Sequence, residues 1–156
     1  MILFNFSVIA KPGQHLGERQ PDSHGMSIWR MFHESTIGRI CLIINEEYQK
    51  PVLEDWLKVE RIKPAFYEMF EEPSANLKAE RIHRIGAVFG KPEWYIDNDP
   101  MTCSETLKLG IPTILVASPY IVRPEWSRER VIKSWDTLVQ EMDEQALKAA
   151  NKTWRE

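Results

Sequence analysis

The stretch of this sequence that says most about its fold is Arg39-Ile40-Cys41-Leu42-Ile43-Ile44-Asn45. Every residue between Arg39 and Asn45 is apolar, so the segment lacks the alternation of a strand with one solvated face. Continuous apolar runs of this length are typical of parallel strands that helices cover on both faces. The segment therefore predicts a buried strand of a parallel α/β sheet.

Segments with strand and helix patterns alternate on both sides of this run. Strands are expected at residues 2–9, 94–96 and 111–117, and a short strand or turn around residues 65–67. A loop is expected at residues 14–25, and helices at 26–35, 50–58, 76–89 and 102–109, the first of them with Ser23 as a cap. Strands that alternate with helices imply parallel pairing with right-handed crossovers. The predicted fold class is α/β, a three-layer Rossmann-like parallel sheet.

A long C-terminal helix is expected from Trp126 to near the end of the chain, because apolar residues recur there at helical intervals. The predicted organisation is thus a single domain, with an α/β body at residues 1–125 and a helix at 126–156 that packs on the body or projects from it. The apolar stripe either covers the open face of the sheet or binds a partner or a second copy of the chain. The candidate contact residues are Trp135, Leu147 and Trp154.

Composition limits the classes of function. The chain has 156 residues, 43% of them hydrophobic, which suits one globular domain with a core. Its net charge of −3 gives no general attraction to nucleic acid, which is an unlikely partner. Residues 1–10 are too short for a membrane span and lack the features of a signal peptide, and Cys41 and Cys103 form no disulfide framework. We therefore expect a cytoplasmic protein without membrane contact.

Ligands of parallel α/β sheets bind beyond the carboxyl ends of the strands. The residues that follow the apolar runs are therefore the candidates for a functional site. They are Asn5, Ser7, Asn45, Asp97, Asp99 and Ser118.

The order of these residues resembles the haloacid dehalogenase-like (HAD-like) superfamily of phosphatases. In that family the first strand ends in Asp-x-Asp and the second in Ser or Thr, and a Lys and an acidic pair follow. The corresponding residues here are Asn5 with Ser7, Asn45, Lys78, and Asp97 with Asp99. The resemblance covers residues 1–117 and points to a degenerate, capless member, of a kind found among bacteriophages, which would place the protein in a host cytoplasm or a virion.

The resemblance implies a chemistry that the replaced residues do not support. In the family the first Asp attacks phosphorus, the second acts as acid and base, and the acidic pair holds Mg²⁺. An amide at Asn5 and a hydroxyl at Ser7 do not titrate near neutrality, so neither can take over these roles. We therefore expect a catalytically inactive domain with no catalytic residue at Asn5, Ser7, Asn45 or Lys78. Asp97 and Asp99 are left as weak ligands for Mg²⁺.

Each candidate also has a simpler interpretation. Asn5 and Ser7 fit a locally polar strand face, Asp97 and Asp99 fit a turn before Pro100, and Lys78 fits a solvated helix face. The leading functional hypothesis is a binding or adaptor protein, whose partner is another protein or a phosphorylated small molecule. The alternatives are a Mg²⁺-dependent phosphatase or nucleotidase with an atypical site, and a structural component of a phage or another assembly.

Overall fold

The computed structural model describes residues 1–117 and 135–153. Its centre is a five-stranded sheet in the order β3-β2-β1-β4-β5, and every neighbouring pair of strands is parallel. The strands are β1 (Ile2–Asn5), β2 (Ile40–Ile44), β3 (Phe66–Met69), β4 (Trp94–Asp97) and β5 (Thr113–Leu115). The predicted α/β class and its parallel sheet are confirmed.

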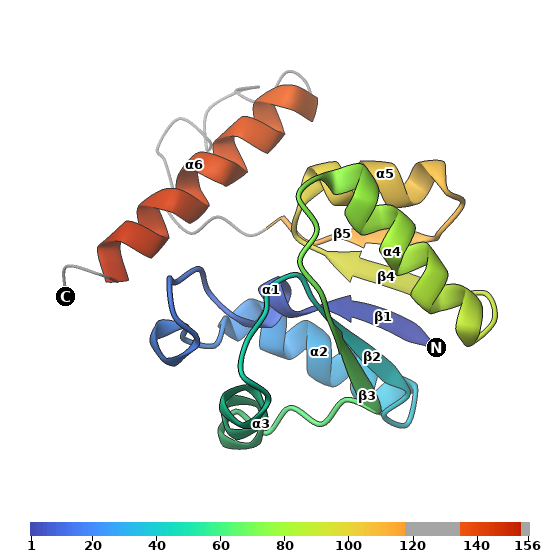
Figure 1. Ribbon diagram of the computed structural model, residues 1–156, viewed down its shortest axis with the longest axis horizontal. Helices are drawn as coiled ribbons and strands as arrows, with labels where there is room; N and C mark the ends of the chain where they lie inside the picture. Colours follow the sequence, from blue (N-terminus) through green and yellow to red (C-terminus); the bar gives the residue numbers. More distant parts are fainter. Residues whose placement is uncertain (118–134, 154–156) are drawn as a thin grey trace.

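Helices connect the strands and form the outer two layers (Figure 1). α2 and α3 pack on one face of the sheet, and α4 packs on the other, beside α5. The helical segments are α1 (Phe6–Ile9), the 3-10 turn η1 (Leu16–Glu18), α2 (Ser23–Ser35), α3 (Lys50–Val59), α4 (Ala75–Val88), α5 (Pro100–Lys108) and α6 (Trp135–Thr153). In the described part of the chain, no helix combines the length and apolar character that crossing a membrane requires.

The core has one part on each face of the sheet. Phe4 of β1 packs edge-on against Trp29 of α2, with ring centroids 5.2 Å apart. Its neighbour Leu3 faces the opposite side, where it joins Ile82 of α4 and Tyr95 of β4. This alternation follows from the period of two in a strand, and burial on both sides explains why β2 is apolar throughout.

The first strand is shorter than predicted, which corrects the strand expected at residues 2–9. β1 ends at Asn5, and Phe6–Ile9 forms the short helix α1. The reason is that Asn5 caps this helix: its Oδ1 accepts a hydrogen bond from the backbone N–H of Ser7 at 2.9 Å. The apolar residues of 6–9 are buried in the helix just as they would be in a strand, so their burial pattern did not reveal the break.

Other boundaries also differ from the predictions. α2 begins at Ser23, within the expected loop, because Asp22 and not Ser23 is its cap and accepts from two backbone N–H groups. The last strand covers only Thr113–Leu115. The described part of the C-terminal helix is α6, and residues 126–134 of the predicted helix lie outside the described residues, as do Ser118 and Trp154.

The position of β1 fixes where the polar strand ends meet. β1 is the central strand, with β2 on one side and β4 on the other. The chain moves outward from β1 to β2 and β3, then returns to the far side of β1 as β4. The carboxyl ends of β1 and β4 therefore form a topological switch point, the place where ligands of such sheets bind.

Candidate functional site

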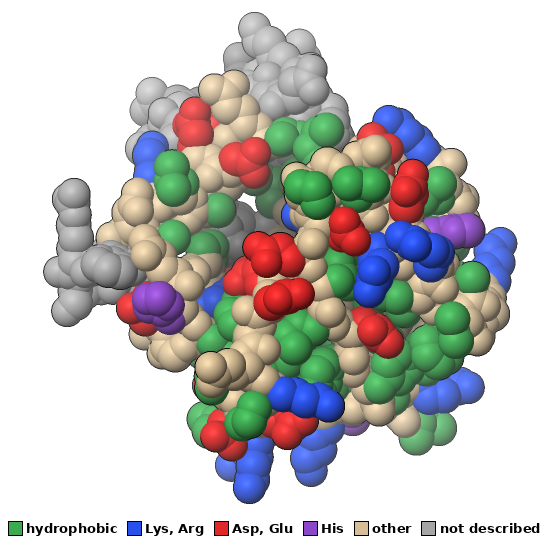
Figure 2. Space-filling model, viewed as in Figure 1, with side chains coloured by type: hydrophobic (Ala, Val, Ile, Leu, Met, Phe, Trp, Pro, Cys, Tyr) green, Lys and Arg blue, Asp and Glu red, His purple; other side chains and the backbone are tan. Residues whose placement is uncertain are grey.

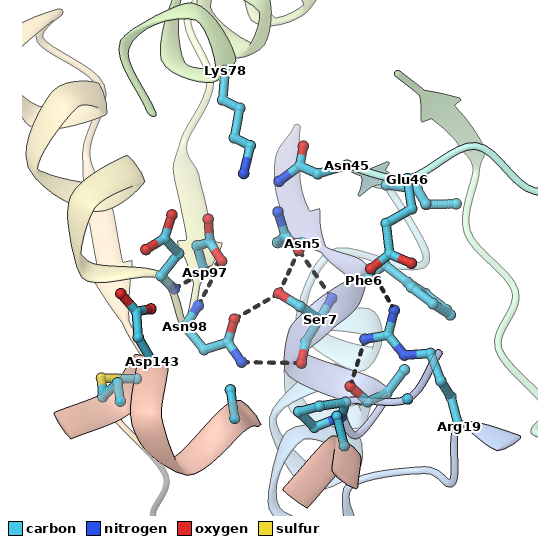
Figure 3. Close-up of a pocket in the computed structure, with 18 of the residues that line it drawn as sticks. Asn5, Phe6, Ser7, Arg19, Asn45, Glu46, Lys78, Asp97, Asn98 and Asp143 are labelled. Carbon is cyan, nitrogen blue, oxygen red and sulfur yellow. Dashed lines mark hydrogen bonds and ion pairs between the residues drawn. The ribbon is translucent and has the colours of Figure 1, made fainter. Parts of the chain in front are cut away.

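A cavity of about 400 Å³ lies at the carboxyl edge of the sheet, between the strand ends and α6. In the space-filling view, acidic side chains lie beside a hollow that separates α6 from the rest of the domain (Figure 2). The polar residues predicted at the strand ends, together with Lys78, come together in the wall of this cavity (Figure 3). They are Asn5, Ser7, Asn45, Lys78, Asp97 and Asp99.

Asn5 and Ser7 form the floor of the cavity at the β1–α1 junction. Ser7 Oγ lies 2.7 Å from Asn5 Oδ1 and 2.6 Å from Asn98 Oδ1. A hydroxyl has a single proton, so Ser7 donates to one of these oxygens at a time. Asn98 also donates from Nδ2 to the backbone carbonyl of Ser7 at 3.1 Å, which ties the β4–α5 loop to the β1–α1 turn.

Beneath this floor, a buried chain of hydrogen bonds joins β1 to β4. Asn5 Nδ2 donates to the hydroxyl of Tyr95 at 3.2 Å, and that hydroxyl donates to Asp97 Oδ2 at 2.5 Å. The amide nitrogen of Asn5 thereby points into the protein and its oxygen toward Ser7. Both ends of the Asn5 amide thus have protein partners.

Asp97 is a buried carboxylate with structural partners on both oxygens. Its exposed fraction is 0%, and its Oδ1 accepts from the backbone N–H groups of Asn98 and Asp99 at 2.7 and 3.1 Å. Burial raises the pKa of Asp97 to about 7; the charge of Asp99 raises it too, whereas the hydrogen bonds from Tyr95 and the backbone lower it. Asp97 is therefore only partly ionised near neutral pH.

Asp99 is the N-terminal cap of α5, which agrees with the simpler interpretation of Asp99 as a turn residue before Pro100. Its carboxylate accepts from the N–H groups of Met101 and Thr102 at the helix N-terminus, and Pro100 occupies the first helical turn. Among residues 1–117 and 135–153, no three side chains of the metal-binding types His, Cys, Asp and Glu gather as a group that could hold a metal ion. Magnesium binding by Asp97 and Asp99 stays a prediction.

Lys78 reaches the cavity from the first turn of α4. Its ammonium points toward the space between Asp97 and Asn45 (Figure 3), which differs from a fully solvated helix face. Within the described part of the chain, Lys78 makes no ion pair or hydrogen bond. The cavity thus contains a cation whose charge no described side chain neutralises directly.

Asn45 follows β2 on the side of the cavity opposite β4. Its Oδ1 is buried and accepts no hydrogen bond from any described residue. Buried polar atoms are normally paired. Asn45 Oδ1 is therefore an acceptor in the cavity wall that can take a hydrogen bond from a ligand.

One residue of this site, a buried arginine, was not predicted from the sequence. Arg19, with a side chain 4% exposed, pairs with Glu46 at 2.8 Å and donates to the carbonyl oxygens of Ala10 and Lys11. Its guanidinium also lies over the ring of Phe6, 5.1 Å from the centroid. Arg19 therefore holds the segment after α1 against the β2–α3 loop, and its charge is neutralised by Glu46.

α6 supplies the outer wall of the cavity. Met142, Asp143, Ala146 and Ala150 line it from one face of the helix, while Leu147 lies away from it and is 63% exposed. Partial burial raises the pKa of Asp143; the charge of Asp99 also raises it, and Lys78 lowers it, which places Asp143 near both groups. The side chain of Trp135 lies outside the described residues.

A scan against protein-family models and a search of curated proteins found no match to this chain. The chemical capacity of the site therefore follows from its own groups. Asn5 cannot form a phosphoenzyme, Asp97 is enclosed, and Asp99 is engaged in capping. The remaining open groups, Lys78 and Asn45, are suited to holding a ligand.

Proposed function

We propose that this chain is a binding protein that holds a small molecule with an anionic group, such as a phosphoryl group, without cleaving it. The observation that carries the proposal is the ammonium of Lys78, which points into the cavity and has no partner among the described residues. A buried or half-buried ammonium is stabilised by an anion within hydrogen-bonding distance. Asn45 Oδ1, a buried acceptor without a partner among the described residues, can accept a hydrogen bond from a hydroxyl or ammonium group of the same ligand.

The distribution of charge also favours a particular kind of ligand. Asp99 and Asp143 bring two carboxylates to the same cavity as Lys78, so a ligand bearing only negative charge would be repelled on that side. A molecule that carries hydroxyl or ammonium donors beside its anionic group satisfies both sides. Sugar phosphates and amino-alcohol phosphates have this combination.

The absence of turnover follows from the positions that resemble the HAD-like superfamily. Asn5 stands where that family has its nucleophile, and both ends of its amide are held by Tyr95 and Ser7. Ser7 stands where the family has its acid and base, and its hydroxyl does not titrate near neutrality. A degenerate HAD-like domain that retains its pocket accounts for both the convergence of the polar residues and their lack of reactivity.

Titration calorimetry with and without Mg²⁺ tests the proposal, using inorganic phosphate, ribose 5-phosphate and O-phosphoethanolamine as probes. We expect one of the two esters to bind the wild type, and Lys78→Met to weaken that binding about tenfold or more, because a charge-assisted contact contributes on the order of 1.5–3 kcal/mol. Lys108→Met removes a lysine that is 67% exposed on α5 and serves as the matched control, with unchanged affinity. Equal affinity of wild type and Lys78→Met for every probe would contradict the proposal.

A further inference from the structure

The edge strand β3 has a free row of backbone groups. In the described part of the chain it pairs only with β2. The register pairs Cys41 with Phe66 and Ile44 with Met69, and the N–H of Phe70 bonds to the carbonyl of Ile44 at 3.0 Å. The even-numbered residues of β3 therefore point their backbone groups toward β2. By the alternation of a strand, Tyr67 and Met69 direct their N–H and C=O groups away from the sheet, where another strand can bond to them.

Opposite charges flank this edge. Lys63 lies before the strand and Glu71 after it, and both residues are exposed. Neither side chain has an ion-pair partner among the described residues. A strand that is basic at one end and acidic at the other is complementary to a second copy of itself in the antiparallel direction, because each basic end then meets an acidic end.

We infer that two copies of this chain pair through β3, antiparallel, about a twofold axis at Tyr67. The two sheets of five strands then become one continuous sheet. In this register Tyr67 lies opposite Tyr67 of the partner copy, and the two residues exchange both of their outward backbone hydrogen bonds, while Phe66 lies opposite Glu68 of the partner copy. Lys63 lies opposite Glu71 of the partner copy, and the symmetry repeats each contact.

The neighbouring registers of the two β3 strands are less favourable for pairing. A shift by one residue would put opposite faces of the two sheets together, so the helical layers would not match. A shift by two in one direction would place Glu68 opposite itself, a repulsive like-charge pair. A shift by two in the other direction would place Tyr67 opposite Ala65, whose N–H already bonds to Ile40, so an outward hydrogen bond would be lost.

The surface next to this edge is apolar enough to be covered. The Phe66 ring lies 4.5 Å from that of Phe89, centroid to centroid, and Phe89 is 45% exposed. Val88 beside it is 77% exposed. Over α4 and β3, basic and acidic side chains lie side by side (Figure 2), a pattern that suits a mixed interface better than binding to a polyanion.

Sedimentation velocity over a range of concentrations tests this inference. We expect the full-length wild type to form a dimer as its concentration rises. Lys63→Glu and Glu71→Lys alone each place like charges opposite each other at two symmetric positions, and each should raise the dissociation constant about tenfold. The double substitution Lys63→Glu with Glu71→Lys restores unlike pairs and should recover the wild-type constant. Lys108→Glu, the same reversal on α5, is the control and should leave dimerisation unchanged.

A backbone substitution separates edge pairing from surface charge. Tyr67→Pro removes an outward N–H that β2 does not use, so the fold should persist, as circular dichroism will report, while the dimer is lost. A wild type that remains monomeric at every concentration overturns the inference. So does a dimer that the single charge reversals and Tyr67→Pro leave intact, because it would use another surface.

Discussion

Asn5 shows how an amide in place of a carboxylate alters the hydrogen bonds of the site. As an amide it donates from Nδ2 to Tyr95 and accepts at Oδ1 from the backbone of Ser7. A carboxylate at this position would accept in both directions, so Tyr95 would face two acceptors with one proton, and a second charge would join the buried Asp97. The amide therefore fits the buried network that surrounds it.

The raised pKa of Asp97 predicts that the free energy of unfolding depends on pH. Its ordinary pKa of 3.8 applies to the unfolded chain, and burial raises it to about 7 in the folded protein. Between these values the folded state binds more protons than the unfolded state, so the free energy of unfolding falls as pH rises from about 4 to about 7. Asp97→Asn should remove this contribution, and the variant should gain stability relative to wild type across this range.

Chemical denaturation of wild type and variant at a series of pH values is the measurement. Asp55→Asn, which neutralises an exposed carboxylate on α3, is the matched control and should follow the wild-type curve. An Asp97→Asn curve parallel to wild type between pH 4 and 7 would mean that Asp97 is ionised at its ordinary pKa.

The site residues that directly follow strands could be predicted from the sequence. Those whose contacts join segments distant in the sequence could not. Asn5, Asp97 and Asn45 were found because the end of an apolar run fixes which edge of a parallel sheet a residue reaches. Arg19 lies in a segment without periodicity, and its partner Glu46 is distant in sequence, so no local pattern connects them. Tyr95 reads as an ordinary apolar strand residue, although its hydroxyl is the link between Asn5 and Asp97.

Among the elements, α6 has the largest effect on the character of the pocket. Sequence periodicity predicted the helix but left open whether it covers the sheet, projects from it or binds a partner. In the structure, Ala146 and Ala150 face the cavity and Leu147 faces away. The small residues therefore leave room for a ligand between the helix and the strand ends.

A bulky side chain at the inner face of α6 should occupy this room. We expect Ala146→Phe to weaken binding of a phosphate-ester ligand tenfold or more, because the ring fills part of a cavity of about 400 Å³. Leu147→Phe adds an aromatic ring one residue away on the exposed face and should leave affinity unchanged. Calorimetric titration of both variants with the same ligand is the test, and equal affinities would show that α6 does not border the binding site.

The short helix α1 shows why some boundaries could not be read from the sequence. Residues 6–9 are apolar and largely buried, as a continued strand would be. The chain turns at Asn5 because a side-chain cap replaces a ladder bond, and this local competition leaves the hydrophobic pattern unchanged. The same holds for Asp22, which begins α2 earlier than the apolar periodicity indicated.

For the molecule as a whole, the two helical layers enclose the sheet completely enough to protect its thiols. Cys41 of β2 is 0% exposed and Cys103 of α5 is 1% exposed. Burial raises the pKa of Cys41 to about 12 and also raises that of Cys103.

We expect neither thiol to react with a disulfide reagent in the native protein near neutral pH, and both to react in guanidinium chloride. The rate of native labelling should therefore follow the opening of the α4–α5 layer. Rapid labelling of one thiol in the folded protein would mean that this layer does not cover the sheet as described.

The sequence established the class of the molecule because parallel strands buried on both faces have a distinctive composition, as residues 39–45 show. It also placed the polar strand ends at one edge, and the central position of β1 brings them together. What it could not establish was the edge environment of β3, since pairing between copies depends on which backbone groups are left free, and not on local pattern.

Binding without cleavage can be tested in one sample by phosphorus NMR of O-phosphoethanolamine or ribose 5-phosphate mixed with the wild-type protein and Mg²⁺. We expect the ester signal of a bound probe to broaden or shift, to return to its free position with Lys78→Met, and no inorganic phosphate signal to grow with time. Growth of inorganic phosphate in the wild-type sample, abolished by Asp97→Asn, would establish a phosphatase with an atypical site. Ester signals that the protein leaves unchanged would contradict binding at this pocket.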